Sequence, residues 1–351
     1  MNKQKIALLT DSCADIPRAL LQRHDIYVVP LKLVFSDGEY ADGVDITPST
    51  VYRRLPTEIP KTTLPSGESV ERAFDRIRQA GYTHVLAIHL SGGLSGTCNL
   101  VRLIAEQTEG LEIAVFDSLS GSLGIGVTVL QAARWIEQGW TWDELLRAIP
   151  PLLRDTHVFF CVDTLEYLQK GGRIGKISAV AGTLLQIKPI ISFAEDGQLV
   201  NVAKMRGRKA AMQKMVQMAT ALVPRGVRFN LAVAHGDSPA ELKAIREMAQ
   251  KSLPDYACFM EGEIDCTDVG SVDAWSRDLQ PEGYPADTDA SGTGFVYYLY
   301  QDLGAEYGKI SPVDEDKYLS WREEYLSGAA ELELPWQSLT AEHIQTLTAA
   351  G

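Results

Sequence analysis

The feature that most constrains the fold is the regular alternation of apolar strands and helical patterns across residues 1–154. Strands are expected at 5–10, 27–35, 84–90 and 111–116. Helices are expected at 15–24, 47–55, 68–79, 97–107 and 123–138, and a capping box formed by Thr141 and Glu144 opens one more. Strands that alternate with helices form a parallel sheet with helices on both faces, so an α/β domain is predicted here.

Polar residues directly follow three of these strands. Thr10-Asp11-Ser12 ends the first strand, the loop 91–97 (SGGLSGT) ends the third, and Asp117-Ser118 ends the fourth. The carboxyl ends of parallel strands meet at one sheet edge, where ligands bind. Helix N-termini at that edge favour an anion, although the same residue types also serve as ordinary helix caps. Three such loops at one edge favour an anion-binding site over caps alone.

The second half of the chain predicts another α/β domain. Strands are expected at 157–162, 187–193, 199–203, 228–235 and 256–264, with Glu195-Asp196-Gly197 as a hairpin turn. Helices are expected at 174–186, after a Gly171-Gly172 cap, at 206–223, and after a capping box of Ser238 and Glu241. We predict domains at 1–154 and 155–300, the second smaller, with a ligand tunnel between them. An acidic, aromatic tail of unknown role follows at 301–351.

Composition excludes several classes of protein. A chain of 351 residues suits two domains, and a net charge of -13 argues against a nucleic-acid partner. The five cysteines form no CxxC pair and no histidine stands at ligand spacing, so neither zinc nor a disulfide framework is expected. No signal peptide and no membrane span of about 20 apolar residues is evident, which predicts a cytoplasmic protein with at most transient membrane contact.

The segment GGRIGK at 171–176 is not a nucleotide-binding loop. A Walker A loop needs GxxxxGK followed by Ser or Thr. Lys170 occupies the position of the first glycine, and Ile177 occupies that of the hydroxyl residue. No nucleotide, metal or other cofactor is therefore predicted.

Several segments resemble the DegV family, whose members bind fatty acids. The longest is DTLEYLQKGGRIGKISAVAGTLLQIKPII at 163–191, followed by KMRGRKA at 204–210. TDSCADIP at 10–17 is similar to the opening signature of the family, and LSGT at 94–97 to its central hydroxyl loop. TTLPS at 62–66 is similar to the loop usually written TSQPS. Leu64 replaces an amide there, and Gly92 stands where a second Ser is common.

The resemblance implies a carrier that is not itself an enzyme. Thr62 and Ser95, helped by the N–H groups of Gly96 and Thr97, would bind the carboxylate of a fatty acid. The carrier would present this carboxylate to a separate ATP-dependent fatty acid kinase, which forms the acyl-phosphate.

Two arginines are candidates for contact with a phosphate or an acidic partner surface. Arg173 and Arg206 have the charge for this role, although a salt bridge to the first domain or a solvated face also explains them. Lys188, inside an apolar strand, is expected to be structural.

The resemblance ends after about residue 272. The family continues with a His-Thr-Gly-Pro-Gly loop whose His and Thr help hold the carboxylate, whereas Asp273 and the residues after it read DAWSRD. The segment ASGTG at 290–294 aligns as a remnant of that loop and makes Ser291 a candidate for the missing Thr. A frame error in the gene would produce the same break.

Two other functions remain open from the sequence. Dihydroxyacetone kinase subunits have a related fold and bind a ketone through a histidine, for which His89 and His235 are candidates, although a structural histidine at a strand end explains both. Alternatively, the chain is a carrier that has lost its lipid function and acts as an interaction module. A copurifying lipid favours the carrier, and turnover without an added kinase favours the enzyme.

Overall fold

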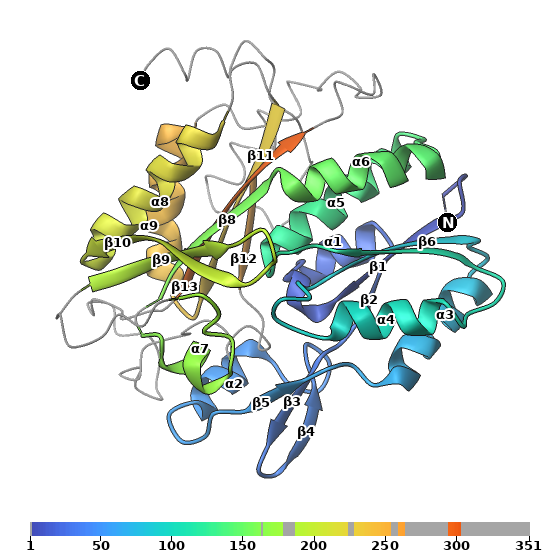
Figure 1. Ribbon diagram of the computed structural model, residues 1–351, viewed down its shortest axis with the longest axis horizontal. Coiled ribbons are helices and arrows are strands. Elements are labelled where there is room, and N and C mark those ends of the chain that lie inside the picture. Colours follow the sequence, from blue (N-terminus) through green and yellow to red (C-terminus); the bar gives the residue numbers. More distant parts are fainter. Residues whose placement is uncertain are drawn as a thin grey trace.

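A computed structural model describes residues 2–162, 164–177, 187–223, 228–253, 259–263 and 294–302 (Figure 1). Within these ranges the strands form a four-stranded sheet, a six-stranded sheet and a small three-stranded sheet. The predicted Ser291, most of the helix expected at 174–186 and the tail after 302 lie outside the described residues, as do Cys258 and Cys266.

The four-stranded sheet confirms the predicted parallel α/β architecture. Its order is β2-β1-β6-β7 and all its neighbours are parallel. The strands are β1 (Ile6–Asp11), β2 (Ile26–Val29), β6 (His84–His89) and β7 (Glu112–Asp117). One face of this sheet is covered by α3 (Gly67–Gln79) and α4 (Thr97–Ala105), and the other by α5 (Leu123–Glu137). The short helices η1 (Ser12–Ala14) and α1 (Arg18–Arg23) lie between β1 and β2 in the sequence. The carboxyl ends of β1, β6 and β7 therefore meet at one edge.

The strand expected at 27–35 is in fact two strands in different sheets. β2 ends at Val29, and β3 (Lys32–Phe35) joins β4 (Gly38–Ala41) and β5 (Lys61–Thr63) in the antiparallel order β4-β3-β5. Pro30 lies at the break, where its missing N–H cannot continue a ladder. β5 was expected as loop, and α2 (Pro48–Arg54) packs its Val51 and Tyr52 into the same small core.

The six-stranded sheet belongs to the second half of the chain. Its order is β10-β9-β8-β13-β11-β12, and β11 with β12 is its parallel pair. The strands are β8 (Thr156–Cys161), β9 (Ile187–Phe193), β10 (Leu199–Arg206), β11 (Arg228–Gly236), β12 (Phe259–Glu263) and β13 (Gly294–Asp302). The helices are α7 (Glu166–Lys170), α8 (Arg208–Leu222) and α9 (Pro239–Ser252). The chain enters this sheet just after the domain boundary predicted between 154 and 155, which stays a prediction.

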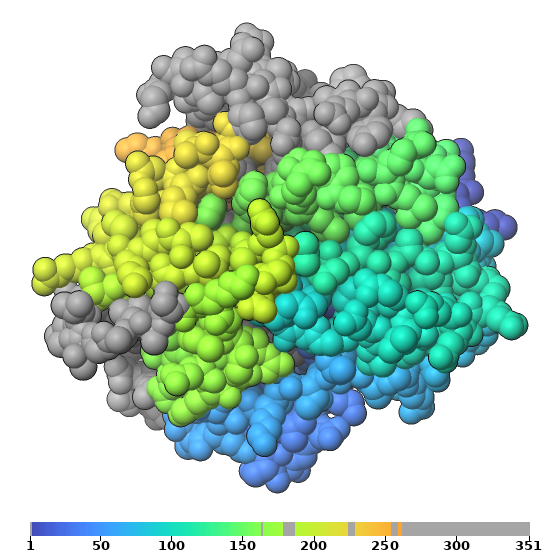
Figure 2. Space-filling model, in the orientation of Figure 1, coloured from blue at the N-terminus to red at the C-terminus, as the bar shows by residue number. Residues whose placement is uncertain are grey.

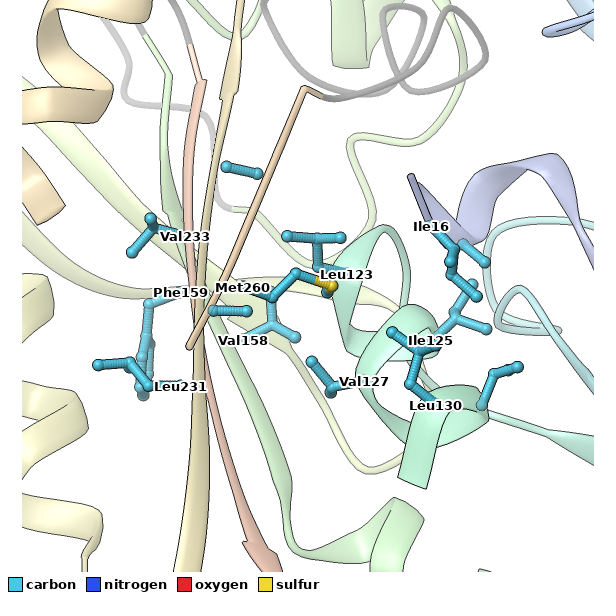
Figure 3. Close-up of a cluster of buried hydrophobic side chains, with 14 of the residues drawn as sticks. Ile16, Leu123, Ile125, Val127, Leu130, Val158, Phe159, Leu231, Val233 and Met260 are labelled. Atoms are coloured by element: carbon cyan, nitrogen blue, oxygen red, sulfur yellow. The ribbon is translucent and has the colours of Figure 1, made fainter. Parts of the chain in front are cut away.

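Helix α5 lies between the two large sheets. Every residue from Leu123 to Ile136 is buried, including the polar Gln131 and Arg134, whose side chains hydrogen-bond to each other. Figure 3 shows Leu123 facing Met260 of the six-stranded sheet and Ile125 facing Ile16 on the other side. With α6 (Trp142–Arg154), whose Thr141–Glu144 capping box forms as predicted, this shared core joins the two halves.

Two local predictions are wrong. Residues 174–177 form a turn instead of the start of a helix, because Gly175 has a φ of +55° and the N–H of Lys176 donates to the carbonyl of Leu199. Ser238 makes no backbone cap, since its hydroxyl donates to the carboxylate of Glu241 at 3.2 Å instead. In the part of the chain that is described, no helix has the length and hydropathy needed to cross a bilayer.

Candidate functional site

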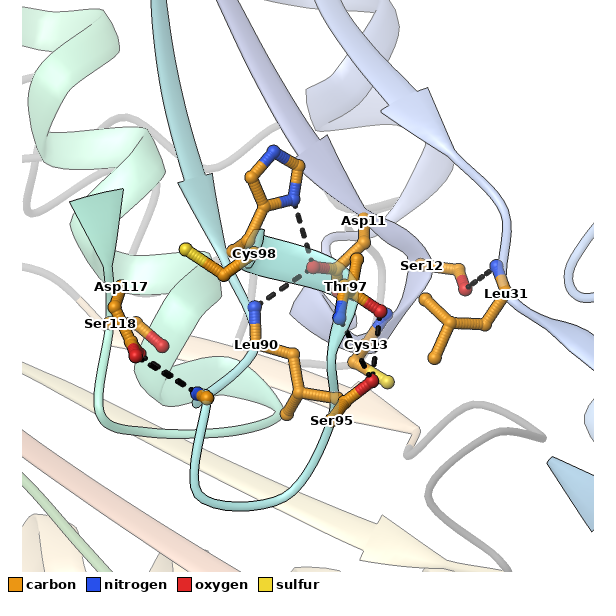
Figure 4. A network of polar contacts seen from close by, with 12 residues as sticks. Asp11, Ser12, Cys13, Leu31, Leu90, Ser95, Thr97, Cys98, Asp117 and Ser118 are labelled. Carbon is orange, nitrogen blue, oxygen red and sulfur yellow. Dashed lines mark hydrogen bonds and ion pairs between the residues drawn. The ribbon is translucent and has the colours of Figure 1, made fainter. Parts of the chain in front are cut away.

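Asp11 ties the carboxyl end of β1 to that of β6 (Figure 4). Its buried carboxylate accepts hydrogen bonds from the N–H groups of Cys13 at 3.1 Å and Leu90 at 2.8 Å. It also contacts Nδ1 of His89 at 3.0 Å. Each of these groups lies inside the protein, so Asp11 holds the strand ends in place instead of facing a ligand.

Asp117 has the same kind of role at the end of β7. Its carboxylate accepts from the N–H of Gly92 at 3.1 and 3.0 Å, and from that of Leu119 at 2.9 Å. A Cβ at Gly92 would lie 2.5 Å from the nearer carboxylate oxygen. The close approach of Asp117 therefore favours glycine at position 92, the departure noted in the sequence, since a side chain there would displace this carboxylate.

A cavity of about 260 Å³ opens beside these strand ends. It brings together four of the predicted site residues, Thr62, Ser95, Gly96 and Arg173, which come from widely separated parts of the sequence. The remaining lining residues are Cys13, Leu31, Thr63, Leu64, Leu90 and Leu94. The cavity thus has a polar end and an apolar wall, the usual composition of a small-molecule site.

Ser95 is held at the polar end by Thr97. The Ser95 hydroxyl lies 2.9 Å from that of Thr97 and accepts from the N–H of Thr97 at 3.3 Å. When the Thr97 hydroxyl donates to Ser95, the Ser95 proton is available to a ligand. The Thr97 N–H, predicted as a ligand contact, is instead occupied by Ser95. Gly96 caps the N-terminus of α4 and lines the cavity, where the helix dipole favours negative charge.

Thr62 faces Ser95 and Gly96 from the small sheet. It lies on β5, where its backbone pairs with that of Leu33, and its side chain has no hydrogen-bond partner among the described residues. Leu64 covers the rim, since a Cβ at Gly96 would lie 3.5 Å from a Leu64 methyl group. The apolar residue that replaces the amide of the family therefore packs over the polar end of the cavity.

Arg173 supplies the positive charge of the cavity. Its Nε donates to the carbonyl of Leu94 at 3.3 Å and its Nη1 to the carbonyl of Gly171 at 2.5 Å. No carboxylate within the described ranges forms an ion pair with it, so the alternative explanation by a salt bridge to the first domain finds no partner there. A half-buried guanidinium that has no ion-pair partner among the described residues is suited to an anionic ligand.

The other sequence candidates lie away from this cavity. Arg206 is exposed at the end of β10, together with Lys204. His89 is fully buried against Asp11. His235 is half-buried, and the loss of hydration lowers its pKa to about 4, while its Nδ1 accepts from the N–H of Ser238 at 3.0 Å. Neither histidine lines the cavity that Arg173 and Ser95 share.

The apolar wall was not predicted residue by residue. Cys13 comes from η1, Leu31 from the link between β2 and β3, and Leu90 and Leu94 from the loop between β6 and α4, and only the general need for an apolar tunnel suggested such residues. Cys13, Cys98 and Cys161 are buried thiols, as the cysteine pattern predicted. Burial raises the pKa of Cys98 to about 11. Within the described part of the chain, no cluster of three or more His, Cys, Asp or Glu residues is arranged to hold a metal ion.

A second, larger cleft separates the two halves on another side. It has a volume of about 600 Å³, and its lining mixes apolar residues such as Phe116, Leu153 and Phe193 with polar ones from β7, α6, β8, β9 and the loop after β7. Asp117 and Ser118 of the third polar loop line it, but none of the predicted carboxylate-binding residues does, so its size alone does not make it the functional site.

Comparison with known proteins gives one consistent match. A family model described as "Uncharacterised protein, DegV family" matches residues 5–271. The match ends beside Val272, where the sequence resemblance was expected to break. A DegV domain-containing protein of Clostridium acetobutylicum is 38% identical over 251 residues, which are 72% of this chain and 89% of that protein. One from Clostridium perfringens is 36% identical over 242 residues, 69% of this chain and 86% of that protein.

Solved structures match most of this chain. A DegV family protein from Thermus thermophilus, described by its fatty acid binding, has a TM-score of 0.74 and 30% identity, covering 86% of this chain and 100% of the other. DegV from Bacillus subtilis, described as a fatty acid binding protein, has a TM-score of 0.72 and 25% identity with the same coverage.

Proposed function

This chain belongs to the DegV family, and we propose that it binds a long-chain fatty acid whose carboxylate contacts Thr62, Ser95 and Gly96. Arg173 then balances the negative charge. Thr97 acts from behind by orienting the Ser95 hydroxyl. Ser291, outside the described residues, stays a candidate for a further contact.

The observation that carries the proposal is the composition of the 260 Å³ cavity. A carboxylate removed from water needs hydrogen-bond donors or a cation, and the cavity is lined by three hydroxyl residues (Thr62, Thr63 and Ser95), a helix N-terminus and an arginine. Leu90, Leu94 and Leu31 face the same space and suit the first methylene groups of an acyl chain. The rest of a long chain needs apolar space beyond this wall, which we assign to a tunnel between the two halves.

The relatives support the ligand class. The structures from Thermus thermophilus and Bacillus subtilis are both described as binding fatty acids. This chain has the same fold as these proteins. The hydroxyl loop and Arg173 of the proposed site lie within the matched residues 5–271.

We further propose that the chain is a carrier and not an enzyme. It would present the carboxylate to a separate ATP-dependent fatty acid kinase in the cytoplasm, where the phosphoryl transfer to acyl-phosphate takes place. The exposed Arg206 and Lys204 on β10 are suited to contact an acidic surface of that partner. A histidine-based ketone enzyme is less well supported, because neither His89 nor His235 lines the cavity.

Native mass spectrometry of the recombinant protein, followed by denaturing extraction, tests the ligand class directly. One fatty acid per chain, or uptake of one added oleate, is the expected result. An empty protein that also fails to bind oleate would contradict the proposal and favour the interaction module. Turnover of a small ketone without any added kinase would favour the enzyme.

A further inference from the structure

The loop that carries Ser95 touches a hairpin of the second half of the chain. The Ser91 hydroxyl donates a buried hydrogen bond of 2.8 Å to the carbonyl of Gly197, in the turn between β9 and β10. The N–H of Gly93 donates to the same hydroxyl at 3.1 Å. Figure 2 shows the yellow-green hairpin lying against the cyan loop at the surface of the molecule. Residues about a hundred positions apart are thus joined next to the cavity.

The two backbones meet at a pair of glycines. A Cβ at Gly93 would lie 2.6 Å from the carbonyl carbon of Gly197 and 2.8 Å from the carbonyl oxygen of Asp196. A Cβ at Gly197, whose φ is +72°, would lie 2.0 Å from the Ser91 hydroxyl. Neither position accepts a side chain without separating the loop from the hairpin, since both contacts involve backbone or a hydroxyl held by two hydrogen bonds.

The same hairpin also holds the turn that carries Arg173. Lys176 donates its N–H to the carbonyl of Leu199 at 2.9 Å, and its ammonium lies 2.5 Å from the carboxylate of Asp196. This ammonium holds the pKa of Asp196 below its usual range. Arg173, three residues earlier, donates back to the carbonyl of Leu94. The contacts therefore close a ring from the loop to the hairpin, to the turn, and back to the loop.

We propose that the hairpin Ala194–Gln198 is the positioning element of the head-group site, with Ser91, Gly93 and Gly197 as its positioning residues. None of the three lines the cavity. Ser95 comes from the first half of the chain and Arg173 from the second, and the ring fixes the distance between them. The recognition of a carboxylate thus depends on a contact outside the cavity, an inference that rests on the proposed function.

The test compares two substitutions of glycines that both have a positive φ. Gly197→Ala introduces a Cβ at positive φ against Ser91, whereas Gly207→Ala introduces one at a φ of +81° with nothing within 4 Å. Gly197→Ala is expected to weaken oleate binding about tenfold or more, while binding of oleyl alcohol, which lacks the carboxylate, changes little. Gly207→Ala should leave both affinities near those of the unmodified chain. Equal effects of the two substitutions, or equal losses of acid and alcohol, would overturn the proposal.

Ser91 supplies a second, coupled variant. Ser91→Ala removes the hydrogen bond to Gly197 and also the hydroxyl that the new Cβ of Gly197→Ala would contact. The fold-loss of oleate affinity in the double variant should therefore be smaller than the product of the fold-losses in the two single variants. Strictly multiplicative losses would contradict a direct Ser91–Gly197 contact.

Hydrogen exchange tests the ring without any ligand. In the lipid-free protein, Gly197→Ala should speed amide exchange in both 91–97 and 171–177, and Gly207→Ala should speed it in neither. Unchanged exchange of the loop in Gly197→Ala would overturn the positioning role even if the protein binds no lipid. A third outcome is that Gly197→Ala speeds the exchange as expected but neither the unmodified protein nor any variant binds oleate. The ring of contacts would then be confirmed as structural. The proposed function would be wrong, and so would the carboxylate-positioning inference that rests on it.

Discussion

Two sets of polar residues lie side by side at the carboxyl edge of the parallel sheet, and they use their hydrogen-bonding capacity differently. In the scaffold set, Asp11, Ser91, Asp117 and Ser118 bond to groups inside the protein. In the head-group set, Thr62, Ser95, Gly96 and Arg173 face a cavity. The two sets contain similar residue types, so position at a strand end does not by itself identify a ligand contact. The head-group set is distinguished by its place on the lining of the 260 Å³ cavity, because Ser95 and Arg173 also make hydrogen bonds within the fold.

The largest expected effect is on stability and concerns the scaffold set. Asp11→Ala leaves the N–H groups of Cys13 and Leu90 and the buried His89 without their acceptor. We expect a loss of about 3–5 kcal/mol in the free energy of unfolding, measured by urea denaturation. Asp75→Ala, which removes an exposed carboxylate paired with Arg78, is the control and should cost less than about 0.5 kcal/mol. A small loss for Asp11→Ala would mean that Asp11 does not belong to the scaffold.

His235 extends the comparison to pH. Burial lowers its pKa to about 4 in the folded protein, against an ordinary value of 6.5. The unfolded chain therefore binds more protons between these values, and the folded state loses stability as the pH falls from 6.5 to 4, by on the order of 3 kcal/mol. His235→Asn, whose amide oxygen can replace Nδ1 as acceptor for Ser238, should give a flatter stability curve in this window. A curve parallel to that of the unmodified protein would show that His235 does not titrate this way.

Arg173 and Arg206 sharpen the comparison from the ligand side. Arg173→Met removes the cation of the cavity and should weaken oleate binding about 10- to 100-fold, since charge-assisted hydrogen bonds contribute about 1.5–3 kcal/mol. Arg206→Met removes an exposed cation outside the cavity and should leave oleate affinity unchanged. Calorimetric titration of the two variants measures both effects. Equal losses would show that the charge of the protein, and not the cavity, governs binding.

The sequence predicted the parallel sheet and the meeting of its polar strand ends because both follow from local patterns. The strands before Asp11, Gly92 and Asp117 are apolar runs with polar ends, and parallel packing brings such ends together. Thr62 was chosen by family resemblance, and its place on a strand of the small sheet was missed. Recognising that sheet requires β3 to be separated from β2, and the break between them at Pro30 lies inside one largely apolar run.

What the sequence could not supply is the pairing of donors with acceptors across long separations. Nothing local distinguishes Ser91, whose hydroxyl is used by Gly197, from Ser95, whose hydroxyl faces the cavity. The same limit explains Thr97, whose N–H was predicted to meet the ligand and is taken by Ser95. Such assignments depend on which segments the tertiary fold places together, and they change the role of a residue without changing its type.

The most direct test of the division into two sets is the lipid occupancy of matched hydroxyl deletions. Native mass spectrometry should show that the double variant Thr62→Ala with Ser95→Ala retains no fatty acid, while its free energy of unfolding stays within about 1 kcal/mol of the unmodified protein. Ser118→Ala, a deletion in the scaffold set, should keep its fatty acid. Full occupancy in the double variant, or loss of lipid in Ser118→Ala alone, would contradict the assignment of these residues.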